Sequence, residues 1–214
     1  MWFHKALRAV ASEYGLRYER QSHGAEVSVL WGRKVDLSRL QAPFTGSHLV
    51  RDPRDVIVSG YHYHLWTNEA WANEPRPELD GQSYQEHLKS LPRNEGLLAE
   101  ISFASRRWLR EMAEWQPRPE FLELRYEEVL GNERATFERV FLHHGFTPQA
   151  ALRAAELCDR FSFERITGRQ VGQIEDRSHH RSGRPDQWLE ELGPEHLALL
   201  DELLPGLLSR TGYR

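Results

Sequence analysis

The sequence has little cysteine and no long apolar run. Cys158 is the one cysteine among 214 residues, which excludes an internal disulfide and favours a reducing compartment. No apolar stretch approaches the roughly 18 residues that span a bilayer, and the first residues lack a signal-peptide pattern. We therefore expect a cytoplasmic protein with no transmembrane segment. Cys158 lies in the helical run AALRAAELC and is expected to be buried and unreactive.

A strong positive charge is also absent. The formal net charge is −4, which argues against general nucleic-acid binding, because such binding needs a basic surface. Hydrophobic residues make up 39% of the chain and charged residues 28%, as in globular proteins. The charge is uneven along the chain, because the segment 160–184 contains six arginines and only three acidic residues. This segment is expected to be a basic loop that is either simply solvated or able to bind an anion.

The eleven histidines form no recognisable metal-binding pattern. Three pairs lie one or two positions apart: His62 and His64, His143 and His144, and His179 and His180. Such pairs do not share a helix face as residues four apart do, and no cysteine or glutamate completes a ligand set. The sequence therefore predicts no metal cofactor.

The order of elements predicts an α/β fold. No repeat, low-complexity stretch or linker divides the chain, so residues 1–214 are expected to form a single domain. Strands are predicted at about 25–30, 46–50 and 121–125. Helices are predicted at about 1–14, 53–66, 83–90, 95–115, 133–144, 148–159 and 194–210, with a loop at 73–81 and an irregular, arginine-rich loop up to residue 185. Strands that alternate with helices indicate a parallel sheet with helical cover.

The most informative segment joins the strand at 46–50 to a helix. Arg51-Asp52-Pro53 supplies a helix N-cap and a proline suited to the first helical position, so a helix should start at Pro53. Arg51 at the strand end and Ser59 two turns into the helix can converge on one pocket. A forked cation and a hydroxyl together suit a terminal phosphate monoester. The alternative is an ordinary capped helix with an exposed arginine.

These residues carry a family resemblance. The stretch RDPRDVIVSGYHYH at 51–64 resembles the 3′-phosphate-binding segment of the sulfotransferases that use 3′-phosphoadenosine 5′-phosphosulfate (PAPS). The resemblance implies that Arg51 and Ser59 hold the 3′-phosphate. The segment FLELRYEEVL at 121–130 is similar to the strand of that family whose tyrosine lies by the adenine, which places Tyr126 there.

Two more segments extend the resemblance toward the C-terminus. RSGRPDQW at 181–188 resembles the loop that closes over the nucleotide, which implies cofactor contacts from Arg181 and Gly183. This sequence departs from the family pattern at Ser182, where a lysine is usual, and at Asp186, where a glycine is usual. FSFE at 161–164 is similar to a segment near the base and makes Phe163 a candidate for adenine packing.

The phosphosulfate-binding loop of the family is not found. Met1-Trp2 falls where that loop would end, which implies that Trp2 lies near the adenine, and there is no glycine before Gly15. The backbone cradle and the lysine of such a loop are therefore missing. We expect a three-layer, P-loop-like parallel sheet that is N-terminally incomplete, either because the true start lies upstream or because the chain is a shortened relative.

The resemblance implies transfer of a sulfuryl group from PAPS to a hydroxyl or amine of a small-molecule acceptor. The base histidine of many family members has no counterpart at 27–37, so the base is unassigned, with His23 and His48 as weak candidates and Asp36 or Glu26 as acidic alternatives. Two other functions stay open: a non-catalytic nucleotide-binding remnant of the fold, and a P-loop nucleotide kinase. The sequence does not specify the acceptor or the oligomeric state.

Overall fold

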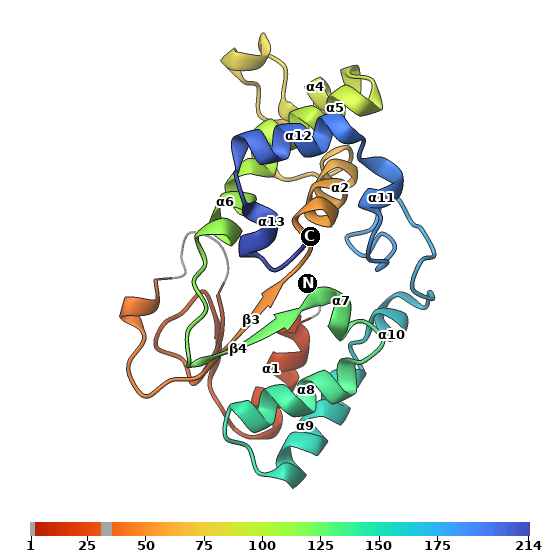
Figure 1. Ribbon diagram of the computed structural model, residues 1–214. Helices are drawn as coiled ribbons and strands as arrows, with labels where there is room; N and C mark the ends of the chain where they lie inside the picture. Colours follow the sequence, from red (N-terminus) through yellow and green to blue (C-terminus); the bar gives the residue numbers. More distant parts are fainter. Residues whose placement is uncertain (1–2, 31–35) are drawn as a thin grey trace. The chain divides into compact units, whose positions relative to one another are not determined.

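A computed structural model describes residues 3–30 and 36–214 of the chain (Figure 1). The chain forms two compact units, and each is built from two separate stretches. The first unit comprises Met1–Val50 and Gln116–Val171, and the second comprises Arg51–Trp115 and Gly172–Arg214. That both belong to a single domain stays a prediction.

The first unit contains two small parallel sheets. Strand β3 (Gly46–Val50) pairs with β4 (Phe121–Arg125), with Gly46 opposite Phe121 (Figure 1). Both strands have the predicted bounds. The second sheet pairs β1 (Tyr18–Arg20) with β2 (Val27–Val29). β1 was not predicted, because its three residues include two exposed charges and show no apolar pattern.

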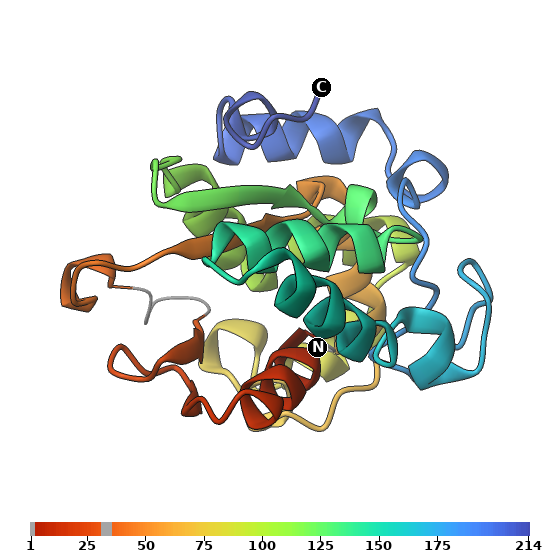
Figure 2. The same cartoon turned by 90° about the horizontal axis from the view of Figure 1, so that it is seen from below.

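Helices cover the core of the first unit. They are α1 (Phe3–Glu13), α7 (Tyr126–Val129), α8 (Glu133–His143), α9 (Pro148–Asp159) and α10 (Phe163–Thr167). Figure 2 shows α8 and α9 side by side, and their buried faces meet around Phe137, Phe141 and Ala155. Small alanines on α9 allow this close approach. Cys158 is fully buried here, and burial raises the pKa of its thiol to about 12, in agreement with an unreactive residue.

The second unit is helical. Its helices are α2 (Pro53–His64), α3 (Ala70–Asn73), α4 (Tyr84–Ser90), α5 (Arg93–Ala99), α6 (Arg106–Glu114), α11 (Trp188–Glu191), α12 (Pro194–Leu203) and α13 (Leu207–Arg210). Ile57 and Val58 of α2 pack against Leu88, Leu97 and Leu109 from α4, α5 and α6. The core therefore surrounds α2, the helix that follows Arg51.

Two predicted helices are interrupted. The helix expected at 95–115 contains a π-helical turn, η4 (Glu100–Ala104), between α5 and α6. The helix expected at 194–210 ends at Leu203, because Pro205 lacks a backbone N–H and Gly206 adopts a left-handed φ of 72°. The predicted irregular loop before residue 185 contains α10, which ends at Thr167 and is followed by Gly168 with a left-handed φ of 68°.

The predicted α/β class is confirmed, as are the parallel pairing of strands and the helical cover. Among the residues that the structure describes, no helix combines the length and the apolar character needed to cross a membrane.

Candidate functional site

The junction between β3 and α2 is built as the sequence predicted. The buried Asp52 side chain caps α2 by accepting a hydrogen bond of 2.8 Å from the backbone N–H of Arg54. The guanidinium of Arg54 also donates a hydrogen bond of 2.6 Å to the same carboxylate. Pro53 is the first helical residue. The helix start is therefore fixed by local contacts, which sets the positions of Arg51 and Ser59.

Arg51 and Ser59 flank the first two turns of α2. Nη2 of Arg51 lies 3.9 Å from Oδ2 of Asp55, and 22% of the arginine side chain is exposed. Ser59 is half-buried and four residues beyond Asp55, so the two share a face of the helix. Its hydroxyl forms no hydrogen bond to any residue in 3–30 or 36–214. A cation thus lies just before α2, and a hydroxyl with no partner among the described residues lies near the middle of the same helix.

The loop that follows residue 180 belongs to the same unit. Arg181 donates hydrogen bonds to Gln187 at 2.7 Å and to Asp176 at 3.2 Å. Gly183 adopts a left-handed φ of 65°, which suits a residue without a Cβ. Ser182 is buried, and its hydroxyl accepts a hydrogen bond from the backbone N–H of Arg184 at 3.2 Å. Ser182, which replaces the family's lysine, therefore serves the loop's own conformation.

Asp55 connects this loop to α2. Its Oδ2 accepts a hydrogen bond from the backbone N–H of Asp186 at 2.8 Å, and its Oδ1 accepts one from Trp188 at 3.1 Å. The guanidinium of Arg54 also lies 3.6 Å from the centroid of the Trp188 ring. Burial raises the pKa of Asp55, while Arg51 and the two N–H donors act in the opposite direction. The structure thus brings together two of the segments predicted to bind nucleotide.

Glu191 forms a second connection that the sequence did not reveal. Its carboxylate lies 2.8 Å from Nε2 of His62, 2.6 Å from Nη2 of Arg93 and 3.7 Å from Nη2 of Arg181. Burial acts to raise the pKa of Glu191, but the hydrogen bonds and charges of His62 and Arg93 together outweigh it and lower the pKa. Glu191 belongs to no recognisable motif, and Asp55 lies inside the 51–64 segment without a role that the resemblance assigns. The one signal for Asp55 was its position four residues after Arg51, at ion-pair spacing.

The predicted adenine contacts lie in the first unit. Tyr126 is the first residue of α7, directly after β4, and is half-buried. Phe163 is 3% exposed at the start of α10, with the guanidinium of Arg169 5.5 Å from the ring centroid. Trp2 lies outside the described residues. The roles of all three residues stay predictions.

The two histidine candidates for the base also lie in the first unit, in different settings. His48 of β3 is opposite Glu123 of β4, and its Nδ1 lies 2.6 Å from Oε2 of that glutamate. His23 lies between β1 and β2, and its buried Nε2 has no hydrogen-bond partner among the described residues. A carboxylate that orients an imidazole is the usual support for a general base, and His48 has one.

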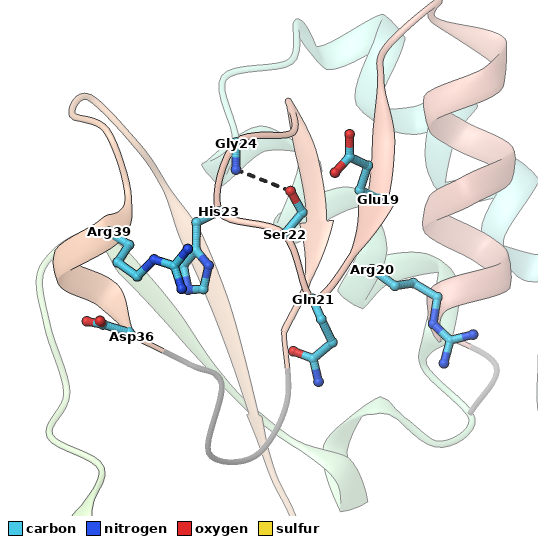
Figure 3. A pocket seen from close by; sticks show the side chains of 8 residues that line it. All are labelled: Glu19, Arg20, Gln21, Ser22, His23, Gly24, Asp36 and Arg39. Carbon is cyan, nitrogen blue, oxygen red and sulfur yellow. Dashed lines mark hydrogen bonds between the residues drawn. The ribbon is translucent and has the colours of Figure 1, made fainter.

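His23 is one of the residues that line a polar cavity of about 760 Å³ (Figure 3). The described residues that line it include Arg20, Arg39 and Asp36. A hydrogen bond from the Ser38 hydroxyl, at 2.6 Å, holds the pKa of Asp36 below its usual value, so this carboxylate is a weak base. In the described part of the chain, no group of three or more histidine, cysteine, aspartate or glutamate side chains is placed to hold a metal ion.

Comparison with known proteins identifies the family. Residues 48–212, well over half of the chain, match the family described as the sulfotransferase domain. The chain belongs to this sulfotransferase family. The match includes the Arg51 to Ser59 segment, Tyr126, Phe163 and the loop at 181–188. The family resemblance stated from the sequence is therefore confirmed.

A solved structure supports the assignment of the fold. The chain is similar to the crystal structure of mouse sulfotransferase SULT7A1 complexed with PAP, with a TM-score of 0.52 and 12% sequence identity. The similarity covers 97% of this chain and 78% of the mouse chain. At this identity the likeness shows the fold alone. A search of curated protein sequences finds no significant match.

Proposed function

We propose that the protein transfers a sulfuryl group from PAPS to a hydroxyl or amine of a small-molecule acceptor. The observation that carries this proposal is the grouping of Arg51, Ser59 and the loop at 181–188 in one compact unit, joined through Asp55. Membership of the sulfotransferase family supports the reaction type. We also propose a cytoplasmic location, on the basis of the single, buried cysteine.

The residues at the start of α2 fit the 3′-phosphate end of such a nucleotide. Arg51 would supply a forked, charged donor, and the unused hydroxyl of Ser59 would supply a second donor. Arg181 and the backbone at Gly183 would close the site. The adenine contacts of Tyr126 and Phe163 are proposed from the family resemblance alone. PAPS itself supplies the activated sulfuryl group. The protein's part in this scheme is to recognise the nucleotide and to orient it.

Removal of the acceptor proton requires a base. We propose His48 in preference to His23, because the carboxylate of Glu123 lies 2.6 Å from its Nδ1 and fixes the orientation of its ring. In such a pair the carboxylate also stabilises the imidazolium that forms when Nε2 accepts a proton. Replacement of His48 with alanine is then expected to lower the transfer rate and leave nucleotide affinity unchanged.

The experiment is a transfer assay with sulfur-labelled PAPS and a panel of phenol, alcohol and amine acceptors. The proposal predicts labelled product from at least one acceptor class and a lower yield from Arg51→Ala. Tight binding of adenosine 3′,5′-bisphosphate without transfer to any acceptor would instead support a non-catalytic binding module. Preference for ADP over adenosine 3′,5′-bisphosphate would support a nucleotide kinase and contradict the proposal.

A further inference from the structure

Asp55 is a fully buried acid whose hydrogen bonds leave its own helix. It lies in the first turn of α2 and has no exposed surface. Its two oxygens accept hydrogen bonds from the backbone N–H groups of Asp186 and Trp188, at 2.8 and 3.1 Å, more than 130 residues along the chain. A single side chain thus fixes two backbone positions of the C-terminal loop.

Helix α2 does not need Asp55 as a cap. An acid in the first helical turn normally satisfies the helix's own free N–H groups or its dipole. In α2 the capping bond is made by Asp52, which accepts from Arg54 at 2.8 Å. Asp55 therefore serves a contact outside the helix.

The loop backbone is in an uncommon conformation at the point of contact. Asp186 has a φ of 58°, a left-handed value that residues other than glycine rarely adopt. Its N–H points to the carboxylate of Asp55, and the Trp188 ring lies under the guanidinium of Arg54. These contacts hold Asp186 and Trp188 of the loop against Arg54 and Asp55 in the first turn of α2.

The same carboxylate also faces Arg51. A buried carboxylate is costly unless it is paired, and the guanidinium at 3.9 Å, together with the two N–H donors, provides that pairing. The residue that holds the loop is thus also an ion-pair partner of Arg51. We propose that Asp55 is a positioning residue that sets Arg51 and the loop at 181–188 in register for the 3′-phosphate, an inference that rests on the proposed function.

Positioning and simple electrostatics predict opposite results. A negative charge next to Arg51 repels a phosphate, so if charge alone mattered, neutralising Asp55 would strengthen nucleotide binding. If Asp55 acts by positioning, neutralising it weakens binding. Asp55→Asn has almost the same shape, but its NH₂ group faces one of the two backbone N–H donors, so one hydrogen bond is lost.

The experiment measures the affinity of Asp55→Asn for adenosine 3′,5′-bisphosphate and for adenosine 5′-monophosphate. We expect a loss of about tenfold for the bisphosphate, the size of one lost charge-assisted hydrogen bond, and a smaller loss for the monophosphate. The matched control is Glu100→Gln, which neutralises another fully buried acid of the same unit that contacts His64, Tyr84 and Ser105. This control should lower stability without changing the ratio of the two affinities. Unchanged or tighter bisphosphate binding by Asp55→Asn would overturn the inference.

Hydrogen exchange provides a readout that does not depend on any ligand. In the wild-type protein without nucleotide, the backbone amides of Asp186 and Trp188 should be protected, and Asp55→Asn should make them exchange faster. Glu100→Gln should leave both amides protected. Unprotected amides in the wild type would overturn the inference even if the Asp55 variant does not fold. If the wild type binds no bisphosphate but shows this exchange pattern, the proposed function fails while the loop contact stands.

Discussion

Arg51 lies just before α2 and Asp55 lies in its first turn, with Nη2 of the arginine 3.9 Å from Oδ2 of the aspartate. The carboxylate is fully buried, whereas 22% of the arginine side chain is exposed. The pair therefore places a partly exposed cation next to the first turn of α2. This geometry leads to specific expectations for variants at the start of α2.

Arg51→Ala should weaken binding of adenosine 3′,5′-bisphosphate by about 2–4 kcal/mol, because a charge-assisted, forked contact is lost from a partly desolvated site. Affinity for adenosine 5′-monophosphate should change little. The affinity of Arg51→Lys for the bisphosphate should lie between those of the wild type and Arg51→Ala, since lysine keeps the charge but lacks the forked donor. Calorimetric titration of the wild type and both variants with each nucleotide measures these affinities. Equal losses for both ligands would mean that Arg51 supports the fold and does not recognise the 3′-phosphate.

Ser59→Ala should cost about 1.5–3 kcal/mol of affinity for the bisphosphate, since one donor to a charged acceptor is removed. Its melting temperature should stay nearly unchanged, because alanine is the better helix former and the hydroxyl has no hydrogen-bond partner among the described residues. Ser102→Ala, at an exposed serine of the same unit, is the matched control. A large fall in melting temperature with unchanged affinity would contradict this role for Ser59.

Glu100→Ala should destabilise the second unit by about 3–5 kcal/mol, because it leaves buried partners without their acceptor. The carboxylate accepts from the hydroxyls of Tyr84 at 2.8 Å and Ser105 at 2.6 Å, and it lies 2.8 Å from Nδ1 of His64. Denaturant unfolding, followed by tryptophan fluorescence, measures the loss. Glu100→Gln should lose less, and a loss below about 1 kcal/mol for the alanine variant would show that the cluster is not a stabilising one.

The stability of the first unit should depend on pH through His144. Its ring lies 2.7 Å from Oγ1 of Thr45 and 3.1 Å from Oγ of Ser47. Burial, and to a lesser extent His143, lowers its pKa from 6.5 to about 4. The unfolded chain therefore binds a proton first, so stability is full above about pH 6.5 and is lost as the pH falls toward 4.

The expected loss is on the order of 2–3 kcal/mol across this range. Urea unfolding at pH 7.5, 5.5 and 4.5 should reveal it, with His144→Gln as the comparison, since glutamine does not titrate. A wild-type curve as flat as that of the glutamine variant would contradict the assignment to His144.

Local signals predicted the elements around the site. The apolar run at 46–50 and the Asp52-Pro53 pair gave the correct end of β3 and the correct start of α2. Each of these features depends on neighbouring residues alone. The boundaries of α10 also depend on neighbouring residues, because Ser162 and Gly168 are ordinary helix-boundary residues, but this helix was not predicted.

The contacts between distant segments could not be predicted. The π-helical turn begins at Glu100, whose carboxylate contacts His64, Tyr84 and Ser105, and these residues come together only in the folded chain. Likewise, the sequence shows an aspartate at 55 and a loop at 181–188 but not the hydrogen bonds between them. Family resemblance named Arg51 and Ser59, and the structure was needed to find Asp55.

The central claim is that the start of α2 recognises a 3′-phosphate. The most direct measurement is a pair of calorimetric titrations of the wild-type protein, one with adenosine 3′,5′-bisphosphate and one with adenosine 5′-monophosphate. We predict that the bisphosphate binds at least tenfold more tightly, as a charged phosphate contact of about 1.4 kcal/mol or more requires. Equal affinities for the two nucleotides would contradict the account.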